Sequence, residues 1–143
     1  MGLLKRLLLL LSLVTSSSAL LGIIGRTQSV AVQGKLTCNG EPAKNVRVKL
    51  YEKEALLDVK LDEGKTNQNG EFSLSGSKTE ISNIDPKVNI YHRCNYDGPC
   101  WRKVGINIPS NFITDGATPE KKFDIGTINL ASRFSNELPD CIN

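Results

Sequence analysis

Residues 34–52 read GKLTCNGEPAKNVRVKLYE, and this stretch decides the fold class. In its second half the apolar side chains of Val46, Val48 and Leu50 alternate with polar neighbours, as in a β-strand with one face in water and the other in a core. Before that strand, residues 39–42 combine Asn, Gly, Glu and Pro, the composition of a tight turn. The stretch therefore predicts an antiparallel strand, turn and strand.

The same two-residue period continues through most of the chain, and no segment of useful length shows the 3.6-residue period of an amphipathic helix. Seven or eight short strands, separated by turns at intervals of roughly 8–12 residues, are typical of a β-sandwich. We therefore expect an all-β domain of two mostly antiparallel sheets. The apolar side chains that share a strand face are Val30, Val32 and Leu36; Phe72 and Leu74; Val88 and Ile90, continued by His92 and Cys94; and Val104, Ile106 and Ile108.

Three segments depart from this regular pattern. Residues 52–65 are highly charged, so we expect an edge strand or a loop there. Residues 109–113 are compatible with a single helical turn. The strand over 123–130 changes the parity of its apolar positions around Gly126, which predicts a β-bulge.

The N-terminus has the three parts of a secretory signal peptide. A basic start precedes an apolar run over residues 7–14, and small residues end in Ser17-x-Ala19. The apolar run is shorter than the roughly 20 residues that cross a bilayer. We expect residues 1–19 to be cleaved and residues 20–143 to form one domain, secreted and extracellular.

Cleavage would also remove Lys5 and Arg6 and lower the formal net charge from +3 to +1. A nearly neutral surface lacks the basic patch that nucleic-acid-binding proteins present. No Asn-x-Ser/Thr sequon occurs, so N-glycosylation is not expected.

Four cysteines, an even number in an exported chain, imply two disulfides. They are Cys38, Cys94, Cys100 and Cys141, which allow three pairings. We expect Cys94–Cys100, because the five residues between them form a turn-rich string, and consequently Cys38–Cys141. The second bond would close a loop on the order of 100 residues and contribute about 4–5 kcal/mol in the chain-entropy model.

The single histidine, His92, lies close to two cysteines, but oxidised cysteines have no nucleophilic thiolate. Because His92 lies on the apolar face of its strand, we expect it to be a hydrogen-bonded core or rim residue. The alternative is that His92 forms a pH-sensitive contact. One histidine and cysteines five residues apart do not fit a structural zinc site. No nucleophile elbow, P-loop, dinucleotide or zinc-protease motif is present, so the sequence predicts no enzyme, metal or cofactor site.

Residues 67–70, Asn-Gln-Asn-Gly, resemble the middle of a calcium-binding EF-hand loop. The first and twelfth positions of that loop would be Lys65 and Gly76, where the motif requires Asp and Glu. We therefore expect a plain turn. A nearby acidic run, interpreted as a solvated edge, comprises Asp58, Asp62 and Glu63.

As a set, five segments closely resemble the secreted transthyretin-like family of nematodes, over roughly residues 28–143. They are the opening stretch, DEGKTNQNGEFSLSGS (62–77), IDPKVNIYHRCN (84–95), FDIGTINL (123–130) and DCIN (140–143). The resemblance implies a transthyretin (prealbumin)-like sandwich and an exported protein, with roles in cell–cell signalling or in recognising exposed surfaces such as phosphatidylserine.

The resemblance does not imply catalysis. Relatives of transthyretin that hydrolyse 5-hydroxyisourate use two or more histidines, an arginine and a C-terminal Tyr-Arg-Gly-Ser, whereas this chain has one histidine and ends in Asp-Cys-Ile-Asn. Thyroxine-type binding depends on a channel between paired dimers, which a single sequence does not reveal.

The leading hypothesis is a non-catalytic extracellular module that binds or bridges a protein, a cell surface or a lipid head group through its loops. The alternative is an extracellular carrier of a small apolar ligand. Trp101 is either part of the contact surface or a plug at one end of the core. The candidate contact residues are Tyr91, Arg93, Tyr96, Trp101, Arg102 and Lys103.

Overall fold

The computed structural model describes residues 2, 5–6 and 24–142. The apolar run of the expected signal peptide and the cleavage site after Ala19 lie outside the described residues. Within the part that is described, no helix has the length and apolar character needed to cross a membrane.

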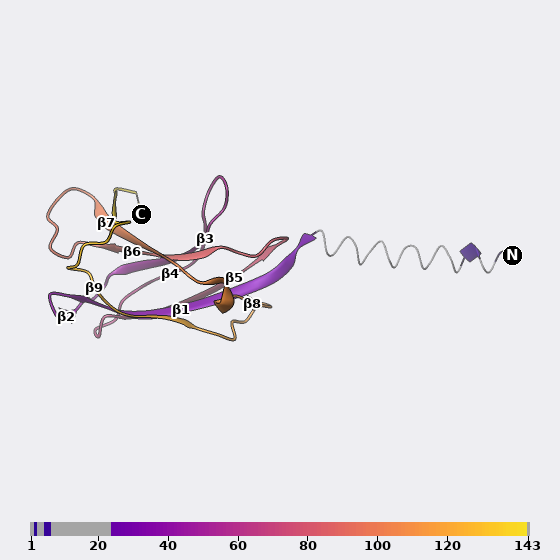
Figure 1. Cartoon of the computed structure of the whole chain (residues 1–143), viewed down its shortest axis with the longest axis horizontal. Helices are drawn as coiled ribbons and strands as arrows, with labels where there is room; N and C mark the ends of the chain where they lie inside the picture. Colours follow the sequence, from indigo (N-terminus) through magenta and orange to yellow (C-terminus); the bar gives the residue numbers. More distant parts are fainter. Residues whose placement is uncertain (1, 3–4, 7–23, 143) are drawn as a thin grey trace.

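Residues from Arg26 onward fold into two layers of strands, one above the other in Figure 1. The prediction of an all-β sandwich is confirmed. Seven strands have six or more residues, and three further pairings are shorter. In chain order the elements are β1 (Arg26–Cys38), β2 (Glu41–Pro42), β3 (Arg47–Glu52), β4 (Val59–Lys65), β5 (Glu71–Glu80), β6 (Pro86–His92), β7 (Trp101–Asn107), the 3₁₀ turn η1 (Ser110–Phe112), β8 (Thr114–Asp115), β9 (Phe123–Asn129) and β10 (Leu138–Asp140).

The first sheet is built around β1, which pairs with β5 and, near its C-terminal end, with β2 along one side, and with β8 and β9 along the other. Among these four partner strands, β9 runs parallel to β1 and the others run antiparallel. Gln33 pairs with Asp124 and Lys35 with Thr127, so two residues of β9 face one residue of β1. Gly126 adopts φ 75°, where a side chain would be strained. The bulge predicted at Gly126 is therefore confirmed.

The second sheet has the order β10-β7-β6-β3-β4, and all of its pairs are antiparallel. The charged segment 52–65 ends in β4, which is an edge strand as predicted. The helical turn expected within residues 109–113 is η1. The short strand β10 was not expected, because its three residues carry no alternating pattern.

The core lies between the two sheets, and the predicted strand faces are the buried ones. Val30, Val32 and Leu36 of β1 have no exposed surface, and neither do Val48 and Leu50 of β3. Each such buried aliphatic side chain contributes about 1.5–3 kcal/mol relative to exposure. The remaining buried apolar side chains of this core are Ala43, Phe72, Leu74, Ile84, Val88, Ile90, Val104, Ile108 and Leu130.

Two turn segments hold each other in place at one end of the sandwich. The buried hydroxyl of Thr66 donates a hydrogen bond to the Ala43 carbonyl at 2.6 Å and accepts one from the Val46 amide at 2.9 Å. Close by, the Leu36 amide donates to the Gly70 carbonyl at 2.8 Å. Gly70 adopts φ 77°, and a Cβ there would meet the Leu36 carbonyl oxygen. These bonds fix the segment that leads into β3, beside the site described next.

Candidate functional site

The loop between β6 and β7, residues 93–100, is held by two disulfides at the end of the sandwich where β1 finishes. The bonds are Cys38–Cys94 and Cys100–Cys141. The expected pairs Cys94–Cys100 and Cys38–Cys141 are therefore wrong, although all four predicted cysteines are bonded.

Strand geometry explains the correct pairing. Cys94 continues the inward side of β6 after Ile90 and His92, so its side chain faces the other sheet, where β1 ends at Cys38. Trp101 pairs with Asp140 in antiparallel register, which places Cys100 beside Cys141. The loop is therefore anchored to the opposite sheet on one side and to the C-terminal segment on the other.

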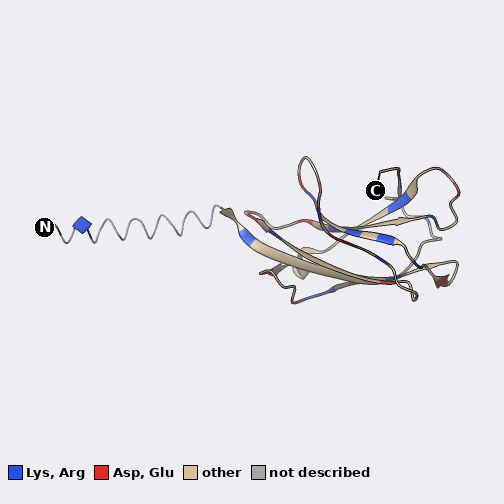
Figure 2. Cartoon of the chain, turned by 180° about the vertical axis from the view of Figure 1, so that it is seen from behind, with Lys and Arg blue, Asp and Glu red and all other residues tan. Residues whose placement is uncertain are grey.

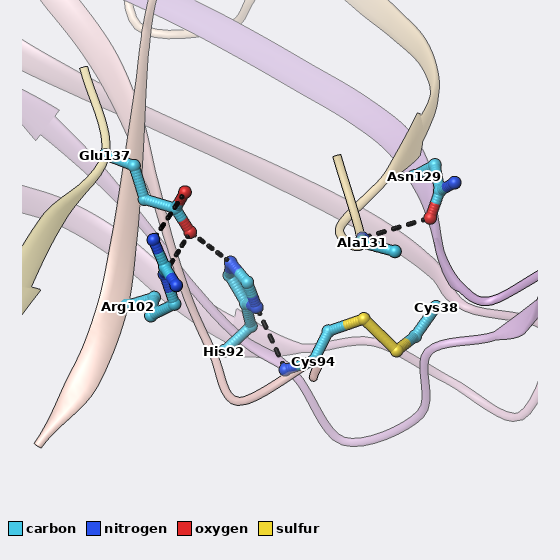
Figure 3. A network of polar contacts seen from close by, with 7 residues as sticks. All are labelled: Cys38, His92, Cys94, Arg102, Asn129, Ala131 and Glu137. Carbon is cyan, nitrogen blue, oxygen red and sulfur yellow. Dashed lines mark hydrogen bonds and ion pairs between the residues drawn. A yellow bond between two sulfur atoms is a disulfide. The ribbon is translucent and has the colours of Figure 1, made fainter. Parts of the chain in front are cut away.

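His92, Arg102 and Glu137 form a polar network directly behind this loop (Figure 3). The His92 Nδ1 atom accepts a hydrogen bond from the Cys94 amide at 3.1 Å, so the ring proton lies on Nε2, which donates to Glu137 Oε1 at 3.2 Å. Arg102 contacts the same carboxylate twice, through Nε at 2.7 Å and Nη2 at 3.2 Å. The network ties β6 and β7 to the C-terminal segment.

Both ring nitrogens of His92 are occupied, and only 2% of the residue is exposed. Burial lowers the pKa of His92 because the charged imidazolium would be removed from water, while Glu137 acts in the opposite direction. The interpretation of His92 as a hydrogen-bonded core residue is confirmed. It is not a surface contact.

Two of the six predicted contact residues, Tyr91 and Arg102, already interact with other side chains of the protein. Tyr91 lies on the outer face of β6 but is only 3% exposed, so the prediction of an exposed contact side chain is wrong. Burial raises the pKa of Tyr91, whose hydroxyl accepts a hydrogen bond from the Asn89 amide at 3.4 Å. The sequence pattern missed this because an outward-facing strand position is still buried when long neighbours cover it; here Lys49 Nζ lies 5.1 Å from the ring centroid. Arg102 is the second, since its guanidinium is held by Glu137.

The remaining predicted contacts surround one exposed aromatic side chain. Trp101 is 39% exposed, and the Arg93 guanidinium lies 4.8 Å from its ring centroid, a cation–π distance. Arg93 Nη1 also donates to the Gly98 carbonyl at 3.1 Å. Tyr96 is half-buried and donates to the Pro99 carbonyl at 2.6 Å, and Lys103 is half-buried and pairs with Asp140 at 3.7 Å.

A groove runs beside Trp101 over the buried ring of Tyr91. It consists of two hollows of about 290 and 60 Å³ that share Asn45, Tyr91 and Trp101. We call these two hollows the Tyr91 groove. Its largely apolar floor and its rim are formed by Cys38, Ala43, Val46, Tyr91, His92, Cys94, Trp101 and Leu130, together with Lys44, Asn45, Arg47, Lys65 and Arg93.

The rim of the Tyr91 groove is cationic. Over the described residues, no carboxylate forms an ion pair with Lys44, Lys65 or Arg93, whereas Arg47 contacts Glu63 at 3.7 Å. Sequence reasoning missed Lys44, Arg47 and Lys65 as groove residues, because they lie at least 26 positions before Tyr91 in the chain. The outward position of Arg47 in its strand was the one available signal.

The acidic residues considered as a calcium site do not converge on one point, and each has other partners. Asp58 pairs with Lys87, and Glu63 with Lys60 at 2.8 Å. Asp62 accepts hydrogen bonds from the Glu63 and Ser75 amides. The turn at 67–70 is closed by the Asn67 side chain, which accepts from the Asn69 and Glu71 amides at 2.9 Å each.

A different acidic cluster, which the sequence did not indicate, lies near the start of β1. The ammonium of Lys78 contacts three carboxylates, those of Glu52 at 3.2 Å, Glu80 at 2.8 Å and Glu54. Glu52 is 2% exposed, and burial raises its pKa. The centre of this cluster is therefore already filled by a cation of the chain itself.

Comparison with known proteins gives consistent matches. The model of the Transthyretin-like family matches residues 33–109. Transthyretin-like protein 5 of Caenorhabditis elegans is 49% identical over 142 residues, covering 96% of this chain and 99% of that protein. Transthyretin-like proteins 33 and 2 of the same organism are 46% and 40% identical, covering 82% and 87% of this chain and 84% and 90% of theirs. The predicted resemblance is confirmed, and the chain belongs to the transthyretin-like family.

Proposed function

We propose that the protein is a secreted, non-catalytic binding or bridging module whose contact surface is the Tyr91 groove with Arg93 and Trp101. One observation carries the proposal. Trp101, which begins β7 and is 39% exposed, stacks with Arg93, which belongs to a loop fixed by two disulfides and has no carboxylate partner in the described structure. Tryptophan and arginine are the residue types most enriched at the energetic centres of interfaces. A rigid loop also loses little entropy on binding.

Export is supported by the pattern of the N-terminal segment and by the two disulfides, which persist in oxidising compartments. The non-catalytic character is supported by the occupation of both His92 ring nitrogens and by the oxidation of all four cysteines. These groups would otherwise be the natural acid–base and nucleophilic residues.

The test uses the full chain, expressed in a secreting host and fluorescently labelled at its N-terminus. It is applied to intact nematode cells and to phosphatidylserine and phosphatidylcholine liposomes. We expect saturable binding to one of these surfaces that Trp101→Ala and Arg93→Glu reduce at least tenfold. Lys35→Glu, an exposed position on the first sheet, is the matched control and should bind like the unchanged protein. Equal binding by all four proteins would refute the groove as contact surface.

A small-ligand carrier is the second candidate. It is favoured by the apolar floor of the larger hollow, whose volume of about 290 Å³ is close to the lower limit of about 300 Å³ for small-molecule pockets. Light scattering on the purified chain separates the two functions. A stable tetramer that retains an organic compound through gel filtration would support the carrier, whereas a ligand-free monomer would support the binding module.

A further inference from the structure

We infer that the Tyr91 groove binds an acidic segment of a partner protein that places one apolar side chain beside Trp101. The inference rests on the proposed function and names the class of partner. Charge complementarity, the apolar character of the floor and the spacing of the cations support it.

The outer face of the second sheet carries a row of four side chains, three cations and Tyr91, one on each of four neighbouring strands. Antiparallel register places Lys65 beside Arg47, Arg47 beside Tyr91, and Tyr91 beside Lys103. Basic segments are visible along the strands of this layer in Figure 2. The carboxylates that pair with the row are Glu63 and Asp140, and within the described part of the chain no carboxylate pairs with Lys65. With Lys44 and Arg93 at the rim, the surface is left with an excess of positive charge that an acidic partner would neutralise.

The floor between these cations is apolar. The Tyr91 ring, the Cys38–Cys94 disulfide and Leu130 line the larger hollow below Trp101. A purely ionic ligand would leave this surface without a partner, whereas a phenylalanine or leucine side chain would fill it. The ligand therefore needs both negative charge and one apolar group.

The spacing of the cations favours an extended peptide over a single head group. Neighbouring strands lie about 4.8 Å apart, so Lys65 and Lys103 are separated by three strand intervals, roughly 14 Å. An extended chain advances about 3.3 Å per residue and covers that distance in roughly four residues. Carboxylates near the two ends of such a segment can then reach Lys65 and Lys103 together, which one phosphate group cannot do.

The only tryptophan of the chain is Trp101, so its fluorescence reports binding in the groove directly. The probe is a seven-residue peptide of alternating Glu and Asp with a central Phe, titrated into the full chain after secretion. We expect a saturable change in Trp101 emission. The apparent affinity should fall at least tenfold between 50 and 300 mM salt, because exposed charges are then screened within a few ångströms.

Two peptide controls and three variants sharpen the test. Replacing the central Phe by Ser should weaken binding at least tenfold, and replacing every acidic residue by Lys should abolish it. Lys65→Glu and Arg93→Glu should each weaken it about tenfold, while Lys35→Glu on the opposite sheet should not change it. Thermal melts of the variants confirm that each is folded.

Several outcomes would overturn the inference. One is the absence of any change in Trp101 emission, and another is equal binding of the Ser peptide. A response to phosphatidylserine vesicles but not to the peptide would identify a membrane as partner, and a response to free benzoate as strong as to the peptide would identify a small carried anion. The vesicle result leaves the proposed binding function standing, whereas groove variants that bind cells normally refute that function itself.

Discussion

The imidazole of His92 and the carboxylate of Glu137 meet at 3.2 Å, although 45 residues separate them in the chain. The carboxylate accepts from the Nε2 proton of His92 and from the guanidinium of Arg102, which itself lies 5.2 Å from the Tyr96 ring centroid. This contact connects the C-terminal segment to β6 and β7, the strands on either side of the 93–100 loop. The strength of this contact therefore affects how rigidly the candidate surface is positioned.

The pH dependence of stability should reveal the buried His92. Because burial lowers its folded pKa, the unfolded chain binds a proton first as the pH falls through about 6.5, and the folded state loses stability below that value. We expect the free energy of unfolding of the unchanged protein to fall between pH 7 and pH 5 by about 1 kcal/mol more than that of His92→Gln. Urea unfolding at both pH values measures the difference. Identical pH profiles would show that His92 does not titrate differently on folding.

Arg102→Gln should destabilise the fold. Glu137 is 5% exposed at its side chain, and loss of the arginine leaves a buried carboxylate with only the neutral imidazole as partner. Removing one partner of a fully buried ion pair lowers the free energy of unfolding by about 3–5 kcal/mol. Because the Arg102 side chain is 27% exposed, we expect a loss of about 2 kcal/mol. Urea unfolding checks this, with Lys60→Gln at an exposed ion pair as a control that should have little effect. A smaller loss for Arg102→Gln than for the control would contradict the role of the network.

The disulfide pairing predicts which cysteine variants behave alike. Cys38→Ala should match Cys94→Ala in melting temperature, and Cys100→Ala should match Cys141→Ala, since each pair removes the same bond. The bonds span 56 and 41 residues, so both contribute similarly, about 4 kcal/mol in the chain-entropy model.

Mass spectrometry of a non-reduced digest checks the pairing directly. Cleavage before Asp97 separates Cys94 from Cys100. The peptide containing Cys94 should then be linked to Cys38 and not to the peptide containing Cys100. A Cys94–Cys100 link would contradict the structure.

Thr66→Val should lower the stability of the fold, although the substitution nearly keeps the shape of the side chain. The substitution removes two hydrogen bonds and leaves the Ala43 carbonyl and the Val46 amide without this partner. Thr66 is 3% exposed, so we expect a loss of about 2 kcal/mol. The exposed Thr127 supplies the matched control, and Thr127→Val should lie within about 0.5 kcal/mol of the unchanged protein. Similar losses for both variants would refute the proposed importance of the Thr66 bonds.

Lys78→Ala should destabilise the fold more at pH 7 than at pH 5. Without the ammonium, the carboxylates of Glu52, Glu54 and Glu80 face one another, and their repulsion is relieved when they take up protons. Because burial already raises the pKa of Glu52, that relief begins above the pH at which an ordinary glutamate is protonated. Thermal melts should therefore show a larger loss at pH 7 than at pH 5. The reverse order would indicate that Lys78 does not hold the cluster together.

Local patterns along the chain were sufficient for most of the fold. Alternation in β1, β3 and β6 identified the core face, since side chains on a strand point to opposite sides at every residue. The parity change at Gly126 located the bulge for the same reason. Both features depend only on neighbours within a few positions.

The candidate site was predicted less completely. Arg93 and Trp101 were identified because aromatic and cationic residues gathered near two cysteines, and both are exposed. Tyr91 was misjudged because burial on an outer face depends on side chains from adjacent strands. Lys44 and Lys65 were not connected with the groove, because strand register brings Lys65 there and the fold of the turn before β3 brings Lys44.

The sequence by itself determined the strand faces, the turns and the family, because these are encoded in short-range periodicity and in local turn residues. Only the tertiary structure decided which cysteines pair, that His92 meets Glu137, and that Lys44, Arg47, Lys65 and Arg93 gather around one apolar groove. Such contacts depend on sheet order and register, which place residues dozens of positions apart within a few ångströms of one another.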